Sequence, residues 1–231
     1  MRRKSFLILA VLFLCAYPAS ASIEFKDGKI HNIDYKIGDY VFVDWKVPGM
    51  ETTVNVLDGA RMSSPYIMIG FENSRINVRG GSISSLASLG STQVDISGGR
   101  VVLFAQDSSQ TNISGGIVSG LFTHYSSQVN ISGGSIEGAL FLANHSIIQI
   151  FGYDFAVDGQ PFGYGELTSI LGGYPHDEPL RHLTGTLLSG ELIDNDFYIG
   201  YDARIVLVPE PASAAILGLG SLFLALRRRH L

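Results

Sequence analysis

The sequence predicts an all-β protein: a right-handed parallel β-helix, or solenoid, of about six coils with a cap at each end. Three observations support this fold. An octapeptide of alternating apolar and polar residues recurs, most copies end in a glycine pair, and the copies are evenly spaced. The clearest copy is 127–134, and the copies end at residues 59, 81, 99, 116, 134 and 153, at intervals of 22, 18, 17, 18 and 19. A nearly fixed period of about 20 residues is typical of stacked repeats.

Within each copy the alternation assigns side chains to two faces of a strand. In the copy that contains Gln93 and Asp95, the residues Val94 and Ile96 share the inward face. The same inward pair recurs in the other copies, and only Thr111 interrupts it. The glycine pairs mark the corners of the coil, because glycine reaches positive φ without steric cost. These corner residues are Gly80, Gly81, Gly98, Gly99, Gly115, Gly116, Gly133 and Gly134.

Two further apolar stretches follow each corner, so that two or three short strands make one coil. One polar position then aligns from coil to coil. It is occupied by Asn55, Asn77, Asp95, Asn112, Asn130 and Gln149. Aligned amides hydrogen-bond along a stack, as they do in cross-β ladders. The alternative is a row of acceptors that binds a glycan or a cation.

Charge and composition exclude several classes of protein. The chain has 231 residues, 46% of them hydrophobic, and 27 glycines, which argues against disorder. Its single cysteine, Cys15, lies in the first apolar run, so the body has no thiol chemistry. No lysine or arginine lies between Arg100 and Arg181. Because such a surface cannot neutralise phosphates, we expect no nucleic-acid partner.

The N-terminal residues 1–21 follow the export pattern. Basic residues at positions 2–4 precede an apolar run over 6–16, and Ala19 and Ala21 form a small-x-small cleavage site. The apolar run is shorter than the ~20 residues of a membrane-spanning helix. We therefore predict a helical signal peptide that signal peptidase removes.

The C-terminal residues form a second signal. Pro209, Glu210 and Pro211 precede an apolar run over 212–226, which as a helix would be about 22 Å long against a hydrocarbon core of ~30 Å. The run ends in Arg227, Arg228 and Arg229, which would stop transfer and stay on the cytoplasmic side. A plain membrane anchor that keeps its tail explains the run and the arginines, but not the Pro-Glu-Pro triplet.

This combination of triplet, apolar helix and arginine cluster resembles the PEP-CTERM sorting signal of Gram-negative bacteria, over about 24 residues. The resemblance implies recognition by an exosortase, a membrane-embedded cysteine transpeptidase or protease. It also implies cleavage near the motif, with Pro209, Glu210 and Pro211 as the recognised triplet. The chain would cross the inner membrane, contact it transiently through the short C-terminal helix, and reach the cell surface or extracellular matrix.

These signals and patterns divide the chain into five segments. They are a signal peptide (1–21), an N-terminal β cap (22–50), the solenoid repeats (51–158), a C-terminal β coil and cap (159–207), and the sorting signal with its short transmembrane helix (208–231). An independent strand pair remains the alternative for the N-terminal cap.

No catalytic constellation is visible in the sequence. A glycosidase needs two carboxylates a few ångströms apart, whereas those of the repeats are scattered. They are Asp95, Asp107, Glu137, Asp154 and Asp158. His176 and His182 flank an acidic pair, 177–178, that could hold a metal, although the exposed loop 174–182 is favoured as plain solvated chain. We expect no enzyme, no cofactor and no metal site.

The expected function is that of a secreted, exosortase-processed protein of the cell surface or extracellular matrix, with a structural or adhesive role in exopolysaccharide or biofilm. Its partners would be exosortase and signal peptidase during export, and exopolysaccharide afterwards. The alternative is a polysaccharide-active enzyme or lectin of β-helix type that is exported by the same route.

Overall fold

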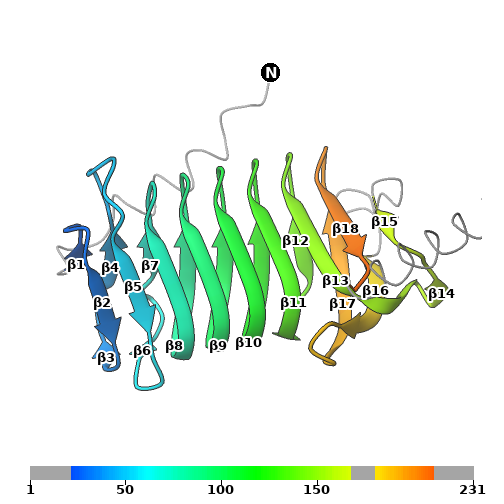
Figure 1. Cartoon of the computed structure of the whole chain (residues 1–231), viewed down its shortest axis with the longest axis horizontal. Coiled ribbons are helices and arrows are strands. Elements are labelled where there is room, and N and C mark those ends of the chain that lie inside the picture. The colour runs from blue at the N-terminus through cyan, green and yellow to red at the C-terminus, as the bar shows by residue number, and fades with distance from the viewer. Residues whose placement is uncertain (1–21, 168–179, 211–231) are drawn as a thin grey trace, which may run out of the picture.

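The computed structural model describes residues 22–167 and 180–210, and this part of the chain contains strands and no helix. Successive coils follow one another along a solenoid, so each strand lies beside strands of the coils before and after it (Figure 1). The all-β solenoid predicted from the repeat is confirmed. The predicted signal helix and C-terminal apolar helix fall outside the described residues, and the right-handedness of the coil stays a prediction.

One face of the solenoid carries the aligned amides, and we call it the amide face. It stacks β2 (Ile30–Ile33), β5 (Thr53–Val56), the first parts of β8 (Arg75–Ser88), β9 (Gln93–Ala105), β10 (Gln110–Thr123), β11 (Gln128–Ile136) and β13 (Ile147–Val157), and then β18 (Arg204–Val208). Seven parallel pairings join these eight strands. The solenoid therefore has about seven turns, and the prediction of six was too low. β2 and β18 add rungs that lack the octapeptide signature.

Two further faces close each coil. The second is short and stacks β3 (Lys36–Ile37), β6 (Arg61–Met62) and the middle parts of β8 to β11. The third, which we call the aromatic face, stacks β1 (Ser22–Phe25), β4 (Tyr40–Val43), β7 (Met68–Gly70), the last parts of β8 to β10, β12 (Leu140–Leu142) and β17 (Leu192–Ile199).

Inward side chains of the three faces fill one continuous core. The alternation places Val94 and Ile96 there, 0% and 1% exposed. Thr111 takes an inward position in register with Val94 and Val129, and it is also fully buried. A second polar column lies inside the coil at the first residue of each copy. Its members are Thr52, Ser74, Thr92, Ser109, Ser127 and Ser146, all 0% exposed.

Both glycines of a corner pair lie close to the backbone of the neighbouring coil, and the second also has a left-handed conformation. The second glycine has positive φ in every pair: 70° at Gly81, 72° at Gly99, 78° at Gly116 and 86° at Gly134. At the first glycine the constraint is close approach between coils. A Cβ at Gly115 would lie 2.6 Å from the carbonyl oxygen of Ser97. No side chain fits there unless the coils move apart.

The first coil differs from the internal ones. His31 takes an inward position opposite Val54, and its Nε2 lies 2.8 Å from Oδ1 of Asp27. Asp44 is fully buried at the end of β4 and accepts hydrogen bonds from the backbone NH (2.8 Å) and the hydroxyl (2.6 Å) of Thr52. The hydrogen bonds of Asp44 tie the end of the first coil to the start of the second, whereas the His31–Asp27 contact lies within the first coil.

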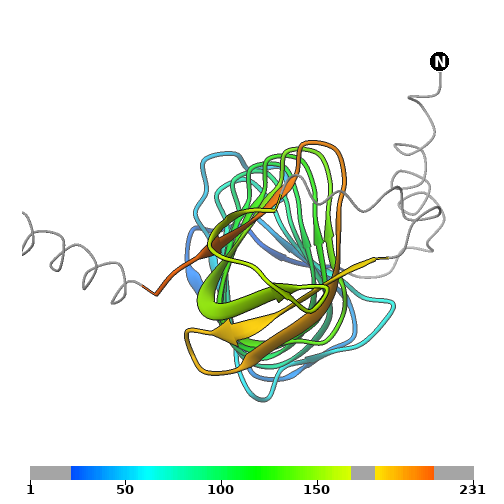
Figure 2. The same cartoon turned by 90° about the vertical axis from the view of Figure 1, so that its right-hand side faces the viewer.

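At the opposite end, antiparallel strands replace the parallel stacking. β16 (Arg181–Leu187) pairs antiparallel with β13 and with β17, while β14 (Gln160–Pro161) pairs with β13 and β15 (Gly165–Glu166) pairs with β18. In the end-on view these segments cross in front of the superimposed coils (Figure 2). They cover the C-terminal end of the core.

Candidate functional site: the amide face and the sorting segment

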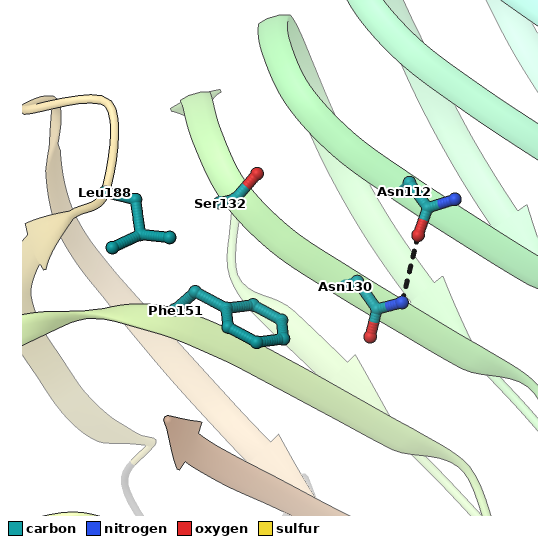
Figure 3. Close-up of a pocket in the computed structure, with 5 residues that line it drawn as sticks. All are labelled: Asn112, Asn130, Ser132, Phe151 and Leu188. Atoms are coloured by element: carbon teal, nitrogen blue, oxygen red, sulfur yellow. Dashed lines mark hydrogen bonds between the residues drawn. The ribbon is translucent and has the colours of Figure 1, made fainter. Parts of the chain in front are cut away.

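Two recesses open on the amide face. The larger, which we call the polar groove, has a volume of about 610 Å³ and is lined by Glu51, Thr53, Asn73, Arg75, Ser91, Gln93, Ser108 and Gln110. The smaller, which we call the Phe151 recess, has a volume of about 340 Å³ and is lined by Asn112, Asn130, Ser132, Phe151 and Leu188 (Figure 3). The Phe151 recess is shallow and open to solvent, and the polar groove is more enclosed.

Side chains of the amide column form hydrogen bonds from coil to coil, and two of its members, Asn112 and Asn130, also line the Phe151 recess. In four places Nδ2 of an asparagine donates to the side-chain oxygen on the preceding coil. The bonds are Asn55 to Asn32 (2.8 Å), Asn77 to Asn55 (2.8 Å), Asn112 to Asp95 (2.8 Å) and Asn130 to Asn112 (2.9 Å). The column therefore ties coils together, and its exposure varies from Asn55, which is buried, to Asn112, which is exposed.

The polar groove repeats the same pair of positions along four coils. Each coil contributes one residue from the corner before the strand and one from the first outward position of the strand. Arg75 donates to Oε1 of Gln93 across one coil boundary at 2.6 Å. The groove contains a single carboxylate, that of Glu51, so it lacks the carboxylate pair that glycoside hydrolysis requires.

The Phe151 recess lies where the C-terminal cap meets the amide face. The turn after β16 docks on the solenoid through Leu188 NH to Phe151 O and Ser189 NH to Ser132 O, both at 3.1 Å. The hydroxyl of Ser189 and the backbone NH groups of Glu191 and Gly134 hold the pKa of the Glu191 carboxyl below its usual value. One wall of the recess is thus built from chain distant in sequence.

The aromatic face carries a column of stacked rings. Phe104 and Phe122 have ring centroids 4.9 Å apart at 9°, and Phe122 and Phe141 lie 5.3 Å apart at 3°. Parallel stacking covers the ring faces with neighbouring rings, which leaves mainly their edges at the surface. This column stabilises the coils and presents little ring face to a ligand.

A charged cluster lies on the C-terminal cap. His182 Nε2 is 2.7 Å from Asp194 and Nδ1 is 2.9 Å from Asp196, and these hydrogen bonds, that to Asp196 foremost, raise the pKa of His182. Its proposed companion His176 lies outside the described residues, as does the acidic pair 177–178. Within 22–167 and 180–210, no group of three or more His, Cys, Asp or Glu residues is placed to hold a metal ion.

Four of the five scattered carboxylates take part in separate contacts, and the fifth, Asp154, is exposed on β13. Asp95 belongs to the amide ladder, and Asp107 accepts a hydrogen bond from the Gly90 NH at 3.0 Å. Glu137 forms a two-pronged ion pair with Arg100, at 2.5 and 2.9 Å, which reaches across the coil between them. Asp158 accepts from Arg181 and from the backbone NH of His182. The fold therefore uses these four carboxylates for structure.

The predicted sorting triplet begins where the solenoid ends. Val208 closes β18 opposite Phe151, and Pro209 and Glu210 follow directly. Pro211 and the arginines at 227–229 lie outside the described residues, as do Ala19 and Ala21 of the predicted signal cleavage site. In the part of the chain that the structure describes, no helix has the length and apolarity needed to cross a membrane.

Phe151 and Leu188 were not identified from the sequence as site residues. Phe151 carries a readable signal, because the equivalent position is serine in the three preceding copies, at 97, 114 and 132. Leu188 has no comparable signal in the sequence, because only the antiparallel cap brings it to the recess.

Comparison with known proteins gives one match. The family model of the PEP-CTERM protein-sorting motif matches residues 207–229. No curated protein and no solved structure matches the chain. The matched segment starts within β18 and contains the triplet and the arginine cluster, so the resemblance predicted from the sequence is confirmed. The chain carries a PEP-CTERM sorting motif at its C-terminal end, which indicates an exosortase-targeted secreted surface protein.

Proposed function

We propose that this protein is a structural or adhesive component of the exopolysaccharide or biofilm matrix of a Gram-negative bacterium. In this proposal signal peptidase removes residues 1–21, and an exosortase cleaves near Pro209, Glu210 and Pro211. The solenoid then remains at the cell surface or in the matrix. The observation that carries the proposal is the sorting motif at 207–229, which continues directly from the last rung of the solenoid.

The shape and surface of the body support this role. Seven turns at ~4.8 Å per coil give a rod about 34 Å long. Its amide face offers rows of hydrogen-bond donors and acceptors, most of them uncharged amides and hydroxyls, spaced by one coil, to a partner that runs along the rod. A hydrated polysaccharide offers hydroxyl groups in a similarly regular row.

Fractionation of cells that express the full chain tests the sorting step. We expect the wild-type protein in the surface and matrix fractions, and the Pro209→Ala/Glu210→Ala double variant in the membrane fraction. Asn77→Ala serves as a matched control, because it changes the body and leaves the motif intact. Equal release of wild type and double variant would contradict exosortase processing at this triplet.

The adhesive step has a separate test. We expect a column of exopolysaccharide isolated from the exporting cells to retain the wild-type protein. Adding free polysaccharide should elute the protein from this column. Passage of the protein without retardation would argue against an adhesive role, whatever the outcome of the sorting experiment.

The second candidate function is that of a lectin or polysaccharide-active enzyme. Within the described residues, the Phe151 recess contains an aromatic ring, two amides and a hydroxyl, but no carboxylate. This composition favours binding over hydrolysis. Release of reducing sugars from the retained polysaccharide would instead support the enzyme.

A further inference from the structure

The Phe151 recess interrupts an otherwise uniform surface. The position that holds serine in three successive coils holds Phe151 in the next, so a bulky apolar ring stands beside a strip of small hydroxyl side chains. Leu188 lies on the far side of the ring, and the ring extends toward Asn130 (Figure 3). Unlike the rings of the aromatic face, Phe151 lies beside polar groups of the amide face.

The polar groups of the recess are held in fixed orientations, and only part of their hydrogen-bonding capacity is taken up within the protein. Asn130 donates one Nδ2 hydrogen to Asn112, which fixes the plane of its amide. Among the described residues no hydrogen bond reaches Oδ1 of Asn130, although Gln149 is its neighbour in register. The hydroxyl of Ser132 donates to Ile113 O at 3.3 Å, which leaves its oxygen free to accept. The ladder thus ends at Asn130, whose Oδ1 and second Nδ2 hydrogen lie beside the Phe151 ring and can bond to a ligand.

The walls of the recess are held by the fold rather than by flexible side chains. Phe151 lies within β13 and pairs with Val208, while backbone hydrogen bonds at 3.1 Å fix the turn that carries Leu188. A preformed site loses little conformational entropy when a ligand binds. None of the five lining residues is charged, so the recess offers an acidic sugar no counter-charge.

We propose that the Phe151 recess binds one neutral hexose unit of a polysaccharide. The C–H face of the pyranose packs on the Phe151 ring, Leu188 borders it, and Asn130 and Ser132 hydrogen-bond to adjacent hydroxyl groups. A recess of about 340 Å³ accommodates a single ring. This inference rests on the proposed association with exopolysaccharide, and it adds the subsite and the class of sugar.

The test compares five forms of the full chain, purified in detergent, on an array of neutral hexose oligomers and uronic-acid oligomers. They are wild type, Phe151→Ala, Asn130→Ala and two matched controls. Tyr125→Asn removes an exposed ring outside the recess at a left-handed position that asparagine tolerates. Asn77→Ala breaks an equivalent ladder bond several coils away.

We expect wild type and both controls to bind neutral oligomers, and each recess variant to bind them about two- to tenfold more weakly. If all five forms bind neutral oligomers equally, the subsite is wrong while the adhesive role stands. Binding to uronic-acid oligomers alone would overturn the neutral-hexose assignment. If wild type binds no oligomer on the array, the subsite is overturned, and the separate column experiment with exopolysaccharide then decides the adhesive role.

Discussion

Thr111 offers the sharpest test of the packing, because replacing it should make the protein more stable. Its side chain is 0% exposed, and its hydroxyl has no hydrogen-bond partner among the residues that the structure describes. The neighbouring coils have Val94 and Val129 at this position, both also 0% exposed. Valine has nearly the shape of threonine, so Thr111→Val should remove a buried unpaired hydroxyl without creating a cavity.

The expected gain follows from the cost of leaving such a group unpaired, about 1–3 kcal/mol. For a chain of this size that corresponds to a rise in melting temperature of about 2–12 °C. Thermal unfolding followed by circular dichroism measures it. Amide hydrogen exchange along β9 to β11 shows whether the gain is local, since solenoid coils can unfold separately.

The reciprocal variant Val129→Thr is the matched control. It introduces the same hydroxyl one coil away and should lower stability by a similar amount. If Thr111→Val leaves the melting temperature unchanged or lowers it, the threonine hydroxyl must form a hydrogen bond in the folded protein, and the premise that it is unpaired is wrong.

Three further predictions concern a corner, a buried carboxylate and a titrating histidine. Gly115→Ala should lower the free energy of unfolding, measured in thermal melts, by about 1–3 kcal/mol, because its Cβ would meet the backbone of the next coil. Gly38→Ala, which has open space around it, is the control and should change the free energy of unfolding by no more than about 0.5 kcal/mol. Asp44→Ala should cost about 1–3 kcal/mol in urea unfolding, since the buried NH of Thr52 loses its acceptor; an unchanged midpoint would contradict this. His182 has a raised pKa in the folded protein, so its stabilising contribution is present below the ordinary value of 6.5 and lost as pH rises through the raised value. His182→Gln should remove this part of the pH dependence in melts between pH 5 and 9, and a variant with an unaltered profile would refute it.

The repeat made the solenoid predictable because stacking imposes the same demands on every coil. Alternation identified inward residues such as Val94 and Ile96, and the aligned amides predicted the ladder that Asn112 and Asn130 form. The buried hydroxyl column is also visible in the sequence, because each copy from Thr52 onward begins with serine or threonine.

The ends of the solenoid were less predictable because they do not repeat. The first rung, β2, and the last, β18, lack the corner glycines, so the sequence undercounted the turns. The antiparallel cap depends on pairing between β13 and β16, which are far apart in the chain. The Phe151 recess lies at this junction, and sequence alone showed only the unusual ring.

At the corner of Gly115 and Gly116, the adjoining coil leaves no room for a Cβ at either glycine, and Gly116 also has positive φ. The local sequence indicates a bend at the pair, but the distance to the next coil appears only in the folded structure.

The most direct test of the account is the intact mass of the protein recovered from the cell surface or matrix. If export and sorting proceed as proposed, the mature chain begins at Ser22 and ends near Pro209, Glu210 and Pro211, without the arginines at 227–229. A recovered chain that still ends at Leu231 would contradict exosortase processing. It would indicate instead that the C-terminal segment is a membrane anchor that the protein keeps.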